Sequence, residues 1–150
     1  MTLEGGSYVV FSPDGKRLVG SVPGSSRRPS DVKVWKVASG QLLMLLKGHE
    51  GKIWQMSFSP DGRFLASNES FAVKVWDLEA RSEISSFNTP AFTRSVVFIR
   101  EGKQLATGHD DGRIILWDAK TSQPVRTLKG HADGCNRLPA RVAWRVVKSG

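Results

Sequence analysis

The chain has 150 residues, 39% of them hydrophobic and 24% charged, which is typical of a folded globular protein. The net charge of +8 raises nucleic acid as a partner, but the basic residues are spread along the chain and do not alternate with aromatic ones. No apolar run approaches the roughly 20 residues that span a bilayer. The start of the chain lacks the pattern of a signal peptide, and Cys135 is the single cysteine, so we expect a cytoplasmic protein without an internal disulfide.

The first predicted unit contains the sequence FSPDG at residues 11–15. Ser, Pro, Asp and Gly suit the four positions of a type I turn, because Pro presets φ and Gly closes the exit. Short alternating stretches separated by such turns are typical of antiparallel strands. The sequence therefore predicts strands near 7–11, 17–21, 32–36 and 41–46.

The sequence FSPDG returns at residues 58–62, and its surroundings return with it. Trp35, Trp76 and Trp117 are each separated by 41 positions, and each follows an alternating stretch and precedes a polar turn. No stretch shows a 3.6-residue period, so the predicted fold class is all-β. The second unit predicts strands near 53–58, 63–67, 73–77 and 82–88, and the third near 94–99, 104–108, 114–118 and 124–129.

Four motifs recur in phase: Gly-His, Ser-Pro-Asp-Gly, Leu-Ala-Ser or Leu-Ala-Thr, and Trp-Asp. In this combination the sequence resembles the WD-repeat (tryptophan–aspartate repeat) β-propeller family over roughly residues 7–134. The resemblance implies that each unit is one four-stranded antiparallel blade and that the blades stack face to face. It places blades at 7–46, 53–88 and 94–129 in a propeller segment 1–134, followed by a divergent tail at 135–150 that is compatible with one extra strand.

Three blades are fewer than the typical number, about 4–8, that closes a propeller. Gly130-His131 matches the start of a further unit, but the residues that follow no longer align with the repeat. We therefore expect an open arc or a fragment of a larger propeller, with apolar end faces that favour self-association or completion of a ring with other copies.

The resemblance also implies a structural polar network inside each blade. A buried Trp indole needs an acceptor, and a Ser or Thr hydroxyl can accept its N–H and pass a hydrogen bond to a His oriented by an Asp. No unit carries the full set: Thr89 stands where the third His belongs, and Ser70 replaces the second Asp, so we expect modest stability of each blade. The matching positions are Ser21 and Trp35, then His49, Ser67 and Trp76, then Thr107, Asp111 and Trp117.

In this family the loops before the first strand and after the second form a rim that carries most partner contacts. Trp and Arg are enriched at binding hot spots. The alternatives are packing between blades, which suits Trp54 equally well and is favoured for Phe92, and ordinary solvated charge for the ionic residues. The matching rim positions are Lys52, Trp54, Glu69, Phe92, Arg94 and Asp110.

No catalytic or cofactor motif is present in the sequence. His49 and His131 are explained by the repeat, and three His residues are too scattered for a metal site. His109-Asp110-Asp111 resembles an acid/base cluster, but a structural turn is the better interpretation. We expect a non-enzymatic scaffold for protein–protein interactions, without cofactor, metal or membrane contact; the alternative is a module of an RNA-containing assembly, suggested by the positive charge.

Overall fold

The computed structural model describes residues 8–22 and 30–129, whose secondary structure consists of β-strands and one short 3-10 helix, η1 (Arg100–Gly102). The predicted strands are confirmed, each within two residues at either end. The first repeat forms β1 (Val9–Phe11), β2 (Arg17–Val22), β3 (Asp31–Lys36) and β4 (Leu42–Leu46). The second forms β5 (Gln55–Phe58), β6 (Phe64–Asn68), β7 (Ala72–Asp77) and β8 (Ser82–Asn88); the third forms β9 (Thr93–Ile99), β10 (Gln104–His109), β11 (Arg113–Asp118) and β12 (Pro124–Lys129).

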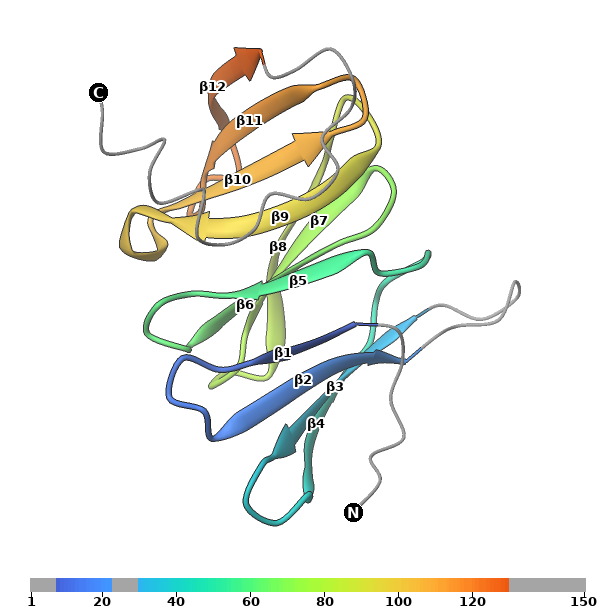
Figure 1. The fold of residues 1–150 in the computed structure, drawn as a ribbon, viewed down its shortest axis with the longest axis vertical. Coiled ribbons are helices and arrows are strands. Elements are labelled where there is room, and N and C mark those ends of the chain that lie inside the picture. Colours follow the sequence, from blue (N-terminus) through green and yellow to red (C-terminus); the bar gives the residue numbers. More distant parts are fainter. Residues whose placement is uncertain (1–7, 23–29, 130–150) are drawn as a thin grey trace.

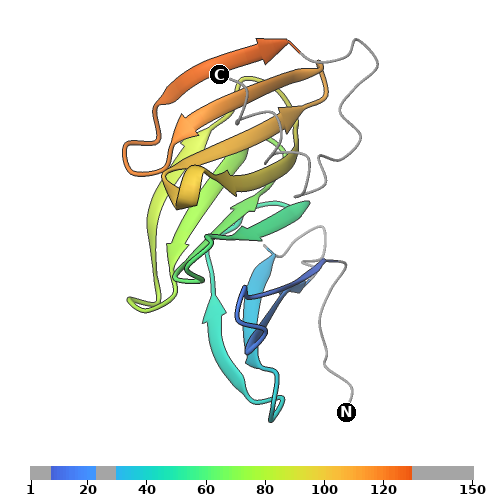
Figure 2. The same ribbon diagram turned by 60° about the vertical axis from the view of Figure 1, so that its left-hand side comes forward.

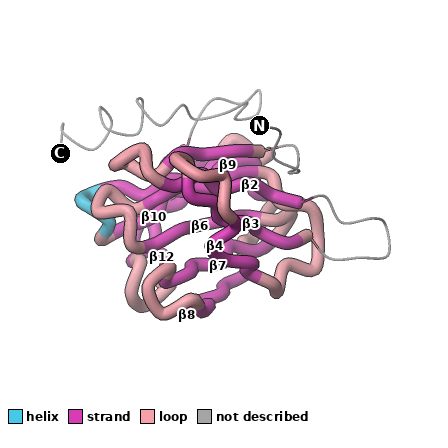
Figure 3. The backbone as a smooth tube through the Cα atoms, turned by 90° about the horizontal axis from the view of Figure 1, so that it is seen from below, coloured by secondary structure: helices cyan, strands magenta, loops and turns pink. Residues whose placement is uncertain are grey.

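Each repeat folds into its own antiparallel sheet, in which the strands lie in chain order. Blade 1 is β1–β4, blade 2 is β5–β8 and blade 3 is β9–β12. Figures 1 and 2 show the three sheets stacked along the long axis of the molecule, and the first strand of each blade contacts the first strand of the next. Seen from below, the blades overlap with β9 on one side and β8 on the other (Figure 3). The all-β class and the three four-stranded blades are therefore confirmed.

The repeated FSPDG sequence forms the same turn twice. Gly15 N–H donates to the Ser12 carbonyl at 2.9 Å, and Gly62 N–H donates to the Ser59 carbonyl at 2.8 Å. Both glycines have positive φ, +68° and +73°, a region that residues with a Cβ seldom adopt. In blade 3 the proline is absent, and the chain there forms η1 in place of this turn.

The core lies between the blades. Each strand alternates its side chains between the two faces of its sheet, and each blade therefore has a tryptophan face and an opposite face with smaller residues. Trp76 packs in a buried cluster with Val19 and Val34 of blade 1, and Trp117 packs in a second cluster with Ala66 and Val75 of blade 2. The tryptophan face of each later blade thus covers the opposite face of the blade before it.

The tryptophan face of blade 1 has no such cover over its first strand. Val9 and Phe11 are 60% and 59% exposed, whereas Met56 and Phe58 at the matching positions of blade 2 are buried. This is the apolar end face expected from the sequence. The far face of blade 3 is also apolar and carries a cluster of four buried residues: Val97, Ile99, Ala106 and Leu116.

The predicted tail at 135–150, with His131 just before it and Cys135 at its start, lies outside the described residues. Within the described part of the chain, no helix is long and apolar enough to span a membrane.

Candidate functional site

A buried hydrogen-bonded chain in blade 2 fixes the loop that leads into β5. The Trp76 indole N–H donates to Ser67 Oγ at 2.8 Å, and Ser67 Oγ lies 2.6 Å from His49 Nε2. All three residues are buried. Since the Ser67 oxygen accepts the indole proton, its own proton is free to bond to the ring nitrogen of His49. The structure therefore brings together the three residues that the repeat predicts for this network.

Glu69 completes this network in place of the expected aspartate. Its Oε2 lies 3.5 Å from His49 Nδ1, an electrostatic contact, and accepts a 2.7 Å hydrogen bond from Gly51 N–H. The His49 ring first, and then Gly51 N–H, hold the pKa of Glu69 below its ordinary value, although burial opposes them. Sequence reasoning placed Glu69 on the rim and Ser70 in the network. A glutamate one position early was the available signal, because its longer side chain compensates for the shortened turn.

Blade 3 builds the corresponding network with a different histidine. The Trp117 indole N–H donates to Thr107 Oγ1 at 2.8 Å, and Thr107 Oγ1 lies 2.8 Å from His109 Nε2. His109 Nδ1 faces the Ala91 carbonyl at 3.2 Å. A carbonyl only accepts, so Nδ1 carries the proton and Nε2 accepts from the threonine. Thr89, which occupies the position of the repeat histidine, contacts the Thr93 hydroxyl at 2.8 Å.

Asp111 does not orient a histidine, contrary to the prediction. The tight turn between β10 and β11 leaves its carboxylate exposed, where Oδ2 accepts from Arg113 Nε at 2.7 Å. The hydrogen bond from Arg113 lowers the pKa of Asp111. His109, on the same strand as Thr107, takes the place of the repeat histidine in this blade. Its Nδ1 faces the Ala91 carbonyl and not the Asp111 carboxylate.

Ser21 is not the partner of Trp35, which corrects the assignment for blade 1. Trp35 lies opposite Leu18, just as Trp76 lies opposite Leu65, so the position that matches Ser67 is Gly20. Ser21 is one residue later and therefore points to the other face of the sheet. A Cβ added at Gly20 would lie 3.0 Å from Trp35 Cζ3, so the indole fills the space that a hydroxyl occupies in the other blades.

The predicted rim residues of blades 2 and 3 meet at the junction between these blades. Trp54 and Phe92 pack edge to face with ring centroids 5.3 Å apart, and Phe71 packs on Phe92 at 5.7 Å. We call Trp54, Phe71 and Phe92 the aromatic rim cluster. Trp54 and Phe92 are half-buried, whereas Phe71 is 56% exposed. Phe71 was not predicted, because its place in the shortened turn has no counterpart in the repeat pattern.

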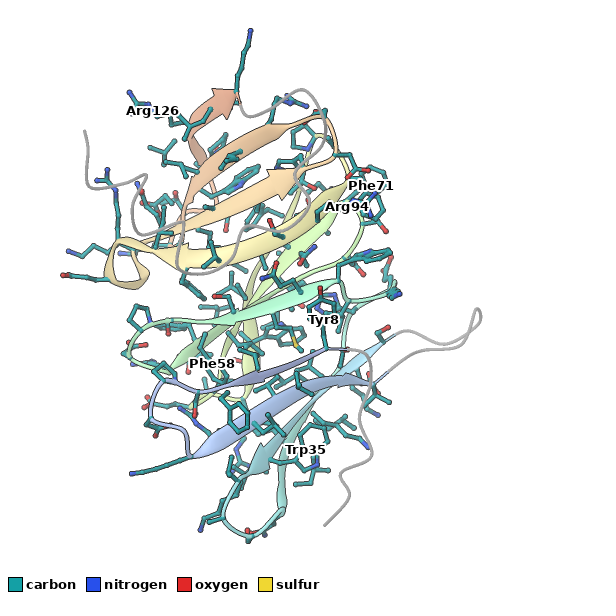
Figure 4. All side chains as sticks on the ribbon, in the orientation of Figure 1. Tyr8, Trp35, Phe58, Phe71, Arg94 and Arg126 are labelled. Carbon is teal, nitrogen blue, oxygen red and sulfur yellow. The ribbon has the colours of Figure 1, made fainter. Side chains whose placement is uncertain are left out.

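Charged side chains surround the aromatic rim cluster. Lys52 Nζ lies 4.5 Å from the centre of the Trp54 ring, and the Arg94 guanidinium lies 4.8 Å from that of Phe92. Arg94 Nε also donates to Asp110 Oδ1 at 2.8 Å, and both side chains of this pair remain nearly half exposed. Figure 4 shows Phe71 and Arg94 next to each other at one edge of the molecule. Aromatic faces with cations over them are suited to binding, and the described residues contain no group of three potential metal ligands.

Comparison with known proteins agrees with this architecture. The family model described as "WD domain, G-beta repeat" matches residues 40–77 and 82–118, half of the chain. The chain belongs to the WD-repeat family. Solved WD40 structures share the fold of this chain. The chain superposes on the RRP9 WD40 repeats with a TM-score of 0.73 and on U3-55K with a TM-score of 0.74. In each case the sequence identity is 23%, and the match covers 84% of this chain and 39% of the other.

Curated WD-repeat relatives are considerably longer than this chain. It is 30% identical over 129 residues to a periodic tryptophan protein 2 homolog of Schizosaccharomyces pombe, covering 85% of this chain and 15% of the relative. It is 35% identical over 114 residues to pre-mRNA-processing factor 19 of Oryza sativa subsp. japonica, covering 74% of this chain and 21% of that protein. This WD-repeat chain thus spans about a fifth or less of these two proteins.

Replacing Ser67 with alanine should destabilise the protein markedly. Ser67→Ala leaves the Trp76 indole N–H and His49 Nε2 buried without a partner, and we expect a loss of roughly 1–3 kcal/mol in the free energy of unfolding, measured in urea. Ser86→Ala is the matched control: Ser86 is exposed on β8, and its loss should change stability by less than about 0.5 kcal/mol. Equal effects of the two changes would show that the Ser67 hydroxyl does not stabilise the blade.

His109 should make stability depend on pH near neutrality. Burial lowers the pKa of His109 below its ordinary 6.5, against weaker opposing effects of the Ala91 carbonyl and Asp111. The unfolded chain binds a proton on His109 at a higher pH than the folded chain does. The free energy of unfolding should therefore fall as the pH is lowered from about 7.5 to about 5.5. Urea unfolding at both pH values measures this, and His109→Gln should remove much of the difference. An undiminished difference in the variant would exclude the His109 ring as its source.

Proposed function

We propose that this WD-repeat chain is a non-enzymatic scaffold that binds other proteins through the aromatic rim cluster and its flanking charges. The observation that supports this most strongly is the meeting of Trp54, Phe71 and Phe92 under Lys52 and Arg94. Tryptophan and arginine are enriched among the few residues that dominate the binding energy of protein interfaces. A partner with an apolar side chain for the aromatic rim cluster and a carboxylate for Lys52, which forms no ion pair within the described residues, would match both components of this surface.

Backbone hydrogen bonds connect the loops that carry Phe71 and Phe92 of the aromatic rim cluster. Thr89 N–H donates to the Phe71 carbonyl at 2.8 Å, and Thr93 N–H donates to the Ser70 carbonyl at 2.8 Å. Asp110 N–H donates to the Phe92 carbonyl at 3.0 Å. These bonds connect the β6–β7 turn to the β8–β9 loop, and that loop to the β10–β11 turn. A rigid surface loses little entropy on binding, which favours display of a preformed site as the mechanism.

A role in an RNA-containing assembly is the second candidate. The net charge of +8 favours it, and one relative is named for pre-mRNA processing. The described part of the chain gives this candidate less support, because several of its cations are already neutralised. Arg63, Lys74, Arg94 and Arg113 each form an ion pair with a carboxylate.

A double change in the aromatic rim cluster and its cation should abolish partner binding without unfolding the chain. The tagged wild-type chain should retain a set of partner proteins in affinity purification followed by mass spectrometry. We expect the double variant Trp54→Ala, Arg94→Ala not to retain them. The same set should survive nuclease treatment. The control is Lys129→Ala at the end of β12, which should retain the set.

Salt dependence separates the two candidate functions. A site held by phosphate contacts should lose affinity steeply as ionic strength rises, whereas a protein site should depend on salt much less. A partner set that disappears with nuclease, together with steeply salt-dependent binding of single-stranded RNA, would replace the scaffold proposal with the RNA-assembly proposal.

The exposed face of blade 1 should also cause the isolated chain to self-associate. Phe11→Ser removes a 59% exposed apolar side chain from this face, and we expect it to reduce the rise of apparent mass with concentration in light scattering. Phe71→Ser is a matched control because Phe71 is 56% exposed but lies on the rim. A wild-type chain that stays monomeric at all concentrations, or an equal effect of both changes, would contradict this expectation.

A further inference from the structure

A groove of about 470 Å³ lies between blades 2 and 3 at the end of the molecule opposite the rim. It is bordered by η1 and by the β11–β12 turn, whereas the rim is made by the β8–β9 and β10–β11 connections. Alternate connections of an antiparallel sheet lie at opposite ends, so the two surfaces are separate. The walls of the groove are mainly apolar, with Phe64, Val75 and Ile84 from blade 2 and Phe98 and Ala119 from blade 3.

The junction between blades 1 and 2 shows how the same place can be closed. The residue after Trp-Asp is Ala119 in blade 3 and Leu78 in blade 2. Leu78 is only 2% exposed and belongs to the core cluster between blades 1 and 2. Ala119 ends at its Cβ, so the volume that a leucine fills at one junction stays open at the other.

A second exchange removes a hydrogen bond across the junction. Phe64 of blade 2 holds the position of Arg17 in blade 1, since each starts the second strand opposite the residue that follows the tryptophan. The Arg17 guanidinium crosses its junction and donates from Nη2 to the Gly62 carbonyl at 2.7 Å. A phenylalanine has no donor for this bond. The second junction therefore lacks the hydrogen bond that Arg17 forms across the first one, and Phe64 gives the groove an apolar wall instead.

The charges at the two junctions also differ. At the first junction Arg63 pairs with Asp77 at 2.8 Å and with Glu79 at 3.5 Å. In the groove the matching residues are Lys103, Asp118 and Lys120. Neither lysine forms an ion pair within the described residues.

The Asp118 carboxylate is held by its own turn and forms no ion pair with either lysine. Its Oδ1 accepts the backbone N–H groups of Lys120 and Thr121, at 2.9 Å and 2.8 Å. One carboxylate oxygen is thus used by its own turn, and the single charge of Asp118 against two lysines leaves the edge of the groove positive toward an anionic partner.

We infer that this groove binds an extended segment of a partner protein in which a large apolar side chain is flanked by Asp or Glu residues. The apolar side chain fills the space beside Ala119, and the carboxylates pair with Lys103 and Lys120. The volume falls within the range of about 300–1,000 Å³ found for ligand sites. Ile84, 51% exposed, extends the apolar surface beyond the groove. This second interaction surface is independent of the rim and goes beyond the scaffold function proposed above.

Selection of peptides from a random displayed library tests the inference directly. The wild-type chain is the bait, and Ala119→Leu, which copies Leu78, is the counter-bait. The expected result is enrichment, on the wild type alone, of sequences that place Phe, Leu, Ile or Trp beside Asp or Glu. Trp54→Ala, a rim change, should retain these peptides, so that failure of this inference and failure of the scaffold proposal can be told apart.

Affinity measurements then test the charges. With a fluorescein-labelled selected peptide, Lys120→Glu, which copies Glu79, should weaken binding by about tenfold or more in fluorescence anisotropy. Lys36→Glu makes the same charge change on the exposed end of β3 in blade 1 and should leave affinity within about twofold. Since Lys120 is exposed, its replacement tests the site without disturbing the core.

Several results would overturn the inference. One is a library in which no peptide distinguishes the wild type from Ala119→Leu, and another is enrichment of peptides without carboxylates. Equal weakening by Lys120→Glu and Lys36→Glu would show a general charge effect and not a site. Displacement of the peptide by a short single-stranded RNA that itself loses affinity in Lys120→Glu would reassign the groove to nucleic acid.

Discussion

A four-stranded sheet with two apolar faces cannot leave both in water without favouring aggregation, and the stacking of blades is the interaction that resolves this. In this chain the bulky tryptophan face of one blade covers the smaller residues of the blade before it. Trp76 thus depends on Val19 and Val34, and Trp117 on Ala66 and Val75. This arrangement gives the stack a direction and leaves the first strand of blade 1, with Phe11, as its uncovered end.

The buried polar networks solve a second problem, which is how a bulky indole with one N–H can be buried between sheets. A hydroxyl on the neighbouring strand accepts that proton in blades 2 and 3, and a histidine accepts the next one. The histidine itself is free to come from different places. His49 comes from the loop before the blade and is faced by the Glu69 carboxylate, whereas His109 comes from β10 and faces a backbone carbonyl. The same requirement is thus met with an acidic partner in one blade and a neutral one in the next.

The twelve strands, the class and the repeated turn were predictable because they depend on local patterns: period-two alternation, the FSPDG turn and the 41-residue spacing of tryptophans. The buried polar networks were less predictable, because they depend on the register of the strands and on which side chains come into contact. Ser21 was chosen by residue type, whereas the face it occupies is set by counting from Leu18. His109 and Glu69 depart from the repeat pattern, and the path of the chain determines that their side chains reach the network. The meeting of Phe71 with Trp54 and Phe92 likewise requires knowledge of how two loops approach.

Repetition gives the two junctions the same backbone arrangement while their side chains differ. Truncating a buried leucine to alanine costs roughly 2–5 kcal/mol when it leaves a closed cavity. At the junction of blades 2 and 3 the space beside Ala119 is an open groove, so water or a ligand can occupy it and the penalty is smaller. The tryptophan cluster that joins these two blades is formed by other residues, including Leu105 and Val96, and does not require a leucine at that position. The stack can therefore keep its stability in one part of an interface while another part is free to evolve a binding surface.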